Sequence, residues 1–438
     1  MNTIRKFLSL VILILSVSGT LPAQFFSDAM SPEALRPFWV INGFGSANFS
    51  LQHNALIAGD ISSTQNNPAF LVNTTRPKAS FSSNYLKQVY QSALMDRGSD
   101  KKAESASFHT DYFGFAYPVN VYQGNLVLAV SYEPSAYYNS ALKSSGTVTF
   151  TAGDVEEEMD IKESGTMNTL RFAGAVEFLP NLNVGLSLNF FNGNRSYESV
   201  KSETDLNNLY TYSQFYYLEA IKPEYNGFNL DLGMTYQSEN FKFGLRLSAP
   251  LKMHIYERSE FTEDYYYDNS TVWDTTEYYD IEYSSRYPWE IAPNFAVKIG
   301  SITLGADLIV RNWQDIEVDQ LTNDEEINRD LYWNLRRTTD IGISLAIPLG
   351  RTISTRFAYR RVPSPYAEFM NDAEEINHLL GAGFETILLK SLILGCSYQR
   401  VVGNRAVPHP YFSTAETTVY SSQSFTNDRL SISLAILL

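Results

Sequence analysis

The sequence predicts an all-β protein, namely a 14-stranded antiparallel β-barrel that spans a membrane and holds an N-terminal hatch in its lumen. Two observations carry this prediction. Apolar and polar residues alternate with a period of two in 14 segments, which indicates strands with one apolar face. The connections between these segments are alternately short and long, so short turns fall at one end of the strands and long loops at the other.

The alternation is clearest in the last segment. There Leu430, Ile432 and Leu434 share one face, and Ser431 and Ser433 share the other. Each segment has about ten residues, which is enough to cross a bilayer when the strand is tilted. The 14 segments lie near residues 78–88, 107–118, 124–136, 168–178, 182–195, 227–237, 240–254, 289–298, 301–314, 338–348, 351–362, 378–388, 390–402 and 428–438.

The connections distinguish the barrel from its main alternative, a soluble β-sandwich or β-propeller. Such folds also give alternating strands, but their strands are usually about five or six residues long and need no strict order of short and long connections. A propeller also needs internal repeats, which this sequence does not display. Residues 147–161, within the second long connection, are expected to form a hairpin outside the set of 14. Residues 202–221 of the third long connection are compatible with an amphipathic helix.

The N-terminal segment divides into two further regions. Arg5 and Lys6, an apolar run to about Val17 and a small-residue segment ending at Ala23 predict a signal peptide over residues 1–23. The alternative, a transmembrane anchor, needs a longer apolar run of roughly 20 residues. Residues 24–77 have no place in the barrel wall and are expected to form the hatch. Residues 78–438 are then the transmembrane barrel with long extracellular loops.

Composition excludes several functions. A formal net charge of -15 argues against nucleic acid, because binding to phosphates needs clustered Lys and Arg. The single cysteine, Cys396, excludes a disulfide framework. No two of the five histidines have the spacing of metal ligands, so no metal, cofactor or catalytic residue is expected. His254 or His378 as the base of a hydrolase on the outer wall is the enzymatic alternative, and no local motif supports it.

The sequence GDISSTQNNPAFL (residues 59–71) is polar and lacks the alternation of the strands. It suits a polar lumen, and Pro68 disfavours an ordinary helix or central strand there. Its pattern G-D-x-S-S-x-x-x-N-P-A resembles the FadL/TodX-type outer-membrane transport proteins, and the resemblance is closest to the versions common in Bacteroidetes-like bacteria. The residues that carry the resemblance are Gly59, Asp60, Ser62, Ser63, Asn67, Pro68 and Ala69.

The resemblance implies a barrel in the outer membrane of a Gram-negative-type bacterium, with a hatch that blocks the lumen. It implies passive transport of a hydrophobic or amphipathic small molecule, such as a long-chain fatty acid or a hydrocarbon. Members of this family have a kink in the third strand that opens the wall sideways, and Pro134 is the candidate for this lateral exit. The alternative is that the strand simply ends at Pro134.

Four arginines are candidate ligand contacts in the lumen: Arg171, Arg246, Arg311 and Arg356. Charge-assisted hydrogen bonds from their guanidinium groups would hold a carboxylate. The alternative is that they pair with luminal carboxylates such as Asp307, Glu177 and Asp231. The long loops are acidic and rich in tyrosine, which leaves aromatic or amphipathic ligands as open as fatty acids.

A different class of function also remains open. PorV-like shuttle proteins of type IX secretion share the fold and an N-P-A hatch motif, and long polar loops suit binding to a protein. The chain is therefore expected to contact outer-membrane lipid and to bind either a hydrophobic small molecule or a protein partner.

Overall fold

The barrel wall is built from the predicted strands. The structure, a computed structural model, describes Leu56 and residues 61–92, 101–122, 124–150, 153–350, 352–365, 376–389, 391–414 and 417–438. All strands form one antiparallel sheet. Its segments are β1 (Lys78–Ser92), β2 (Lys101–Val119), β3 (Leu126–Tyr137), β4 (Ser140–Phe150), β5 (Gly153–Leu179), β6 (Leu182–Asp205), β7 (Tyr212–Gln237), β8 (Phe241–Ser248), β9 (Lys252–Tyr267), β10 (Val272–Arg286), β11 (Glu290–Ile299), β12 (Ile302–Asn312), β13 (Glu317–Asp319), β14 (Arg337–Leu349), β15 (Ile353–Pro363), β16 (Ile376–Leu389), β17 (Leu392–Thr414) and β18 (Thr417–Leu437).

Four of the wall strands are interrupted, so 18 segments make 14 wall strands (18 minus 4). The interruptions separate β3 from β4, β8 from β9, β11 from β10, and β12 from β13. In the first two cases both segments pair with the same neighbour, β5 or β7 respectively. Pairing of β1 with β18 closes the barrel, which confirms the predicted 14-stranded antiparallel fold.

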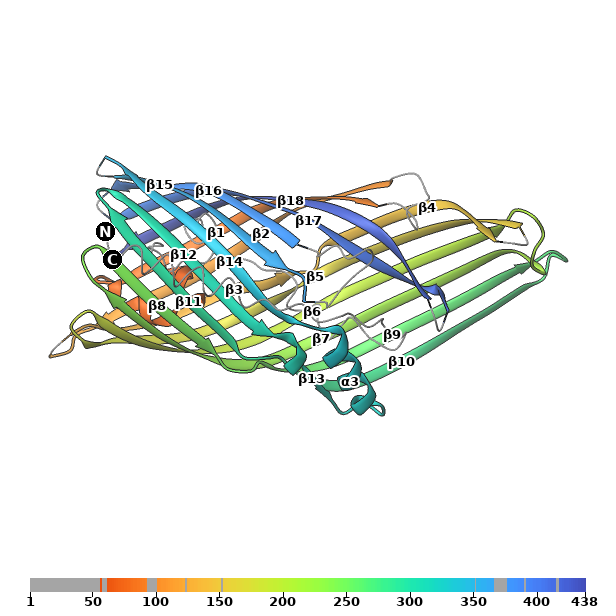
Figure 1. The fold of residues 1–438 in the computed structure, drawn as a ribbon, viewed down its shortest axis with the longest axis horizontal. Helices are drawn as coiled ribbons and strands as arrows, with labels where there is room; N and C mark the ends of the chain where they lie inside the picture. The colour runs from red at the N-terminus through yellow and green to blue at the C-terminus, as the bar shows by residue number, and fades with distance from the viewer. Residues whose placement is uncertain are drawn as a thin grey trace.

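Short turns lie at one end of the barrel, together with the C-terminus (Figure 1). Near this end the 3₁₀ helices η3 (Ile61–Gln65) and η4 (Pro68–Asn73) lie inside the wall, where η3 contacts β2 and β3, and η4 contacts β5, β6 and β7. The 3₁₀ helix η6 (Trp313–Asp315) and helix α3 (Asp324–Asn334) lie between β12 and β14. Within the described residues, no helix is both long and apolar enough to span a bilayer.

The two faces of the wall differ as the period of two requires. On β18, Leu430, Ile432 and Ile436 are exposed on the outside, whereas Arg429 and Ser431 are buried inside. On β7 the exposed outer residues are Phe228, Leu232 and Tyr236, which places an aromatic residue at each edge of the apolar band. The outer face therefore matches lipid, and the inner face is lined by polar side chains.

Several strands continue far beyond this apolar band, which corrects the prediction of long loops. β5 has 27 residues, β6 has 24 and β7 has 26, so much of the second and third connections is strand. β9 and β10 occupy much of the fourth. The hairpin expected at residues 147–161 is formed by β4 and β5. Residues 202–221 are not a helix: β6 runs to Asp205 and β7 begins at Tyr212, because each pairs with a long neighbouring strand. These extensions project as one curved sheet (Figure 1).

Replacement of Leu232 by arginine tests the position of the lipid band. Leu232 lies near its middle on β7, so a charge there is expected to lower the free energy of unfolding by about 2–4 kcal/mol. The measurement is urea unfolding in lipid vesicles. Leu218→Arg is the matched control, since it lies on the same strand and outer face but beyond the band, and its effect is expected to stay below about 1 kcal/mol. Equal losses for the two variants would contradict this placement.

Candidate functional site

The hatch motif is fixed to the inner wall through the Asn67 side chain. Asn67 precedes η4, and its Oδ1 accepts a hydrogen bond from the backbone N–H of Ala69 at 3.0 Å. Its Nδ2 donates to the backbone carbonyl of Met234 on β7 at 3.1 Å and to that of Leu245 on β8 at 3.3 Å. Proline follows as the first residue of η4, where a missing N–H leaves no helical bond unmade. One amide side chain thus caps the hatch helix and joins it to two wall strands.

Glycines in the wall make room for this contact. A Cβ at Gly185 on β6 would lie 2.4 Å from the backbone nitrogen of Ala69, and one at Gly233 on β7 would lie 2.2 Å from Oδ1 of Asn67. The two glycines face each other directly in the β6–β7 ladder. The hatch backbone therefore rests on the backbone of the wall, where any other residue would force the two apart.

Part of the predicted hatch lies outside the described residues. Gly59 and Asp60 lie outside the described residues, as do the predicted signal peptide and most of residues 24–60. Asn67, Pro68 and Ala69 are described and buried. Their position inside the wall agrees with a hatch, whereas their role in gating stays a prediction.

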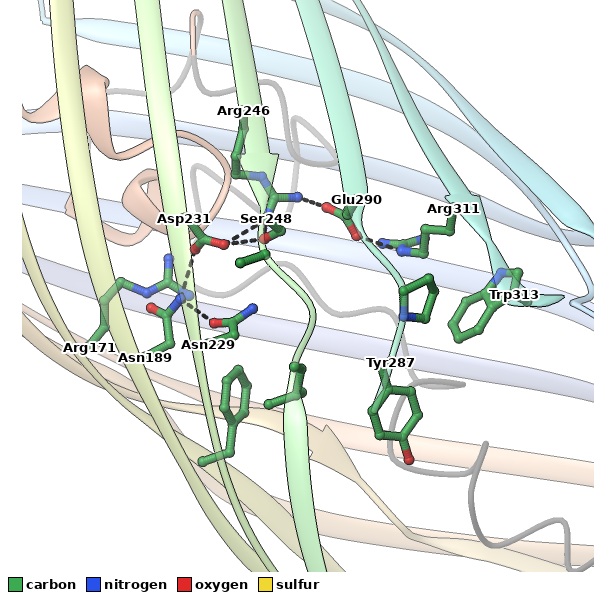
Figure 2. A pocket seen from close by; sticks show the side chains of 14 residues that line it. Arg171, Asn189, Asn229, Asp231, Arg246, Ser248, Tyr287, Glu290, Arg311 and Trp313 are labelled. Carbon is green, nitrogen blue, oxygen red and sulfur yellow. Dashed lines mark hydrogen bonds and ion pairs between the residues drawn. The ribbon is translucent and has the colours of Figure 1, made fainter. Parts of the chain in front are cut away.

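A belt of ion pairs lies on the inner face of the wall, further from the short turns than the contact between Asn67 and the wall glycines. Arg171 on β5 and Glu133 on β3 are 3.2 Å apart, with side chains only 7% and 1% exposed. Glu290 at the start of β11 binds Arg246 of β8 and, at 2.5 Å, Nε of Arg311 on β12. The pairing continues around the wall, since Arg311 also binds Asp340 of β14 at 2.9 Å. Figure 2 shows Glu290 between the two arginines.

Asp231 on β7 forms the second centre of this belt. It accepts hydrogen bonds from Ser187 at 3.1 Å, from Asn189 at 2.8 Å and from Ser248. Arg246 approaches the same carboxylate at 4.0 Å, which links Asp231 to the chain of ion pairs (Figure 2). Buried charges are stable only when they are paired and hydrogen-bonded, and this carboxylate meets both conditions.

A cavity of about 160 Å³ lies next to the belt, inside the barrel. Its polar wall is the belt itself, and its other wall includes Phe191, Leu251, Tyr287 and Trp313. These last side chains belong to or pack against a larger cluster of apolar and aromatic residues. That cluster comprises Ala136, Tyr138, Met167, Tyr225, Leu251, Met253, Ile255, Tyr283, Tyr287, Trp313, Ile316, Val318, Leu331 and Leu335. The cavity is therefore amphipathic, with hydrogen-bonding groups on one side and apolar surface on the other.

The structure brings together three of the four predicted arginines. Arg171, Arg246 and Arg311 line the cavity, whereas Arg356 pairs with Glu385 at 3.1 Å elsewhere in the lumen. All four are engaged in ion pairs, and the role predicted for them in holding a carboxylate stays a prediction.

The carboxylates that pair with the three cavity arginines include some that the sequence did not single out. Only Asp231 was expected among them, while Asp307 binds Arg360 instead. Glu133, Glu290 and Asp340 complete the belt. Their positions in the alternation of apolar and polar residues would have placed them in the lumen. The register between strands, however, determines which side chains are neighbours, and it cannot be read from one sequence.

Pro134 lies at an irregularity of the third wall strand. The β2–β3 ladder ends at Phe113–Tyr132, and the β3–β5 register shifts between Pro134 and Ala136. Beyond this bulge the chain turns inward, so that the Tyr137 hydroxyl lies 3.3 Å from Nδ2 of Asn84 and 3.4 Å from the carbonyl of Thr110. Among the described residues no backbone ladder joins β4 to β2. The wall thus loses its continuous pairing here, and the use of this place as a lateral exit stays a prediction.

The chain has counterparts among known proteins. The model of the BamG family matches residues 3–354, and no curated protein sequence matches the chain. Among solved structures, a Pseudomonas aeruginosa FadL homologue is 13% identical with a TM-score of 0.58, covering 90% of this chain and 99% of that one. The Pseudomonas putida toluene transporter TodX is 11% identical with a TM-score of 0.57, covering 91% and 99%.

The CymD monoaromatic hydrocarbon channel is 13% identical with a TM-score of 0.55, covering 91% of this chain and 99% of that chain. At these identities the likeness is one of fold. It confirms that the architecture resembles the FadL/TodX type, as the hatch motif and the strand count predicted.

Gly185→Ala tests the contact between hatch and wall. The new methyl group would collide with backbone atoms of Pro68 and Ala69, so the hatch is expected to shift and ion current across a planar bilayer to rise. Overpacking of this kind is expected to lower stability by about 1–3 kcal/mol. Gly174→Ala on β5 is the control, because its methyl group would lie 3.3 Å from a flexible leucine side chain and 3.9 Å from the backbone oxygen of Val127, which is ordinary van der Waals contact. An unchanged current and stability in Gly185→Ala would argue against a wall-bound hatch.

Proposed function

The chain belongs to the BamG family, and we propose that it transports hydrophobic molecules with a polar head group passively across the outer membrane. The observation that carries the proposal is the amphipathic cavity enclosed by the barrel. Apolar ligands bind in concave, mostly apolar pockets whose few polar groups fix their orientation. The hydrocarbon part of a ligand fits against Leu251, Tyr287 and Trp313, and its head group fits the polar side.

The fold supports transport rather than catalysis. Structural neighbours are described as a toluene transporter and a monoaromatic hydrocarbon channel. On the proposed path, the molecule enters at the extracellular end and reaches the cavity. The hatch blocks its way further along the lumen, so it leaves sideways through the wall past the bulge at Pro134. Such a path lets a hydrophobic molecule enter the membrane without crossing the polar space on the other side.

Charge balance favours a neutral head group over a carboxylate. The cavity arginines, Arg171, Arg246 and Arg311, carry three positive charges. Their partners Glu133, Asp231, Glu290 and Asp340 carry four negative charges, so the sum is -1. A ligand carboxylate would have to displace one of these carboxylates, whereas a hydroxyl group needs only a hydrogen bond. We therefore propose an alcohol-like or phenol-like amphipathic molecule in preference to a fatty acid anion.

Ala249→Trp tests this proposal. Ala249 lines the cavity and takes no part in the ion pairs, so an indole there fills the space and leaves the belt intact. Uptake of radiolabelled decanol by Gram-negative cells that produce the protein is expected to fall at least about tenfold. Leu206→Trp, at an exposed extracellular position, is the control for the substitution itself.

Comparison of ligands separates the parts of the proposal. Decanol is expected to enter faster than decanoate, because the belt has no positive charge in excess. Faster uptake of decanoate would overturn the choice of head group. No uptake of decanol, decanoate or decane above that of cells lacking the protein would overturn transport altogether.

A further inference from the structure

Within the described residues, β10 has a long edge without a β-strand partner. It pairs with β9 over all 15 of its residues, but with β13 only at Ser284, Ser285 and Arg286. The remaining 12 residues (15 minus 3), residues 272–283, have one side of their backbone unpaired within the described part of the chain. At about 3.4 Å per residue this edge is roughly 40 Å long. Figure 1 shows β10 at the border of the projecting sheet.

Natural proteins usually protect such an edge with charged side chains, lysine above all, or with proline, a bulge or a very short strand. Residues 272–283 (VWDTTEYYDIEY) contain no lysine and no proline. The register between β9 and β10 runs without a shift from Val272 to Arg286, so the strand has no bulge that would turn the edge away. The negative charge of its carboxylates is the protection that remains, so its backbone is suited to pairing with a strand of opposite charge.

Apolar side chains lie exposed along the same edge. Tyr278 is 73% exposed and Trp273 is 48% exposed, and Val272, Tyr279 and Ile281 are also exposed. Because successive side chains of a strand point to opposite faces, Tyr278 and Tyr279 offer aromatic surface on both sides of the edge. Exposed apolar surface of this kind is typical of an interaction site.

Charge specifies the chemistry of the partner. The edge carries Asp274, Glu277, Asp280 and Glu282, and no Lys or Arg occurs anywhere in residues 259–285. Asp274 lies directly opposite Asp264 of β9, so the acidic surface extends across two strands. A second copy of β10 would bring carboxylates against carboxylates, which is unfavourable. A basic strand would gain ion pairs along the whole edge.

We propose that residues 272–283 bind an extended segment of another protein, rich in Lys or Arg, as an added β-strand. Backbone hydrogen bonds to β10 supply affinity, and alternate side chains of the segment meet the carboxylates and the aromatic rings. The site lies on the extracellular extension, away from the cavity, so it is independent of the transported molecule.

The ladder geometry shows where a substitution would act on this edge alone. The Tyr267 N–H donates to the carbonyl of Thr271 at 2.9 Å, so 267–271 is a hydrogen-bonded pair of the β9–β10 hairpin. Pairs alternate along an antiparallel ladder, and Thr276 therefore belongs to a non-hydrogen-bonded pair. Its N–H points away from β9, towards the unpaired edge. Thr276→Pro removes this donor and leaves the β9–β10 ladder intact.

The experiment measures binding of a synthetic peptide of 12 residues that alternates lysine with valine and tyrosine. Isothermal titration with the full-length, detergent-purified protein is expected to give saturable binding that weakens as salt rises. Thr276→Pro is expected to weaken binding at least about tenfold, since it blocks strand addition. Thr276→Val keeps the N–H and is expected to bind within about twofold of the unchanged protein. Retained heat-modifiable mobility on electrophoresis establishes that both variants are folded.

Each other outcome overturns the proposal. Equal binding by Thr276→Pro and Thr276→Val would mean that the peptide is held by charge alone and not as a strand. Absence of binding would remove the site, and dimers that dissociate with Thr276→Pro would make a second copy the occupant. Binding that occurs only after deletion of residues 24–55 would make the chain's own N-terminal segment the occupant.

Discussion

The need to satisfy every backbone hydrogen bond in lipid governs this structure. Hydrocarbon offers neither donors nor acceptors, so a sheet can cross a membrane only when its first and last strands pair. The β1–β18 ladder does this, and with 14 wall strands it encloses a space too wide for the wall side chains alone to fill. What occupies the lumen follows from this closure.

The lumen is filled in three layers along the barrel axis. The segment with η3 and η4, which was predicted to form the hatch, lies nearest the short turns, where Asn67 and the wall glycines bring two backbones into contact. The belt of ion pairs comes next, and its members are buried yet paired. The aromatic and aliphatic cluster follows. The cavity lies between the second and third layers and takes its amphipathic character from this order, because one wall consists of charges and the other of apolar side chains.

Beyond the lipid band, the backbone no longer needs to satisfy all its hydrogen bonds within the sheet. Water can satisfy an open edge, so the strands that extend outwards need not close into a ring. Among the residues that the structure describes, β10 has an unpaired side over most of its length. The same backbone groups that must be paired in the membrane are available for a partner outside it. The described part of the chain thus combines a closed wall with an open sheet.

The sequence by itself determined the class of fold, the number of wall strands and the face that each strand turns to lipid. These follow from the alternation of apolar and polar residues with a period of two. The alternation is a local pattern, so it can be recognised in one strand without knowing which strands pair with it. The motif around Asn67 likewise indicated a hatch from a few consecutive residues. Other features could not be predicted from the sequence. Tyr217 and Ile221 fitted a helical face as well as a strand, and only pairing with β6 and β9 decided for a strand.

Only the tertiary structure decided which carboxylate pairs with which arginine, where the ladder between β2 and β3 ends, and which strand edge lacks a partner among the described residues. Arg171 meets Glu133 because β3 and β5 pair in one particular register, and Glu290 joins Arg246 to Arg311 because β11 lies between β8 and β12. Register is a relation between residues distant in the chain. It is set by closure of the whole barrel, and no local pattern of residues contains it.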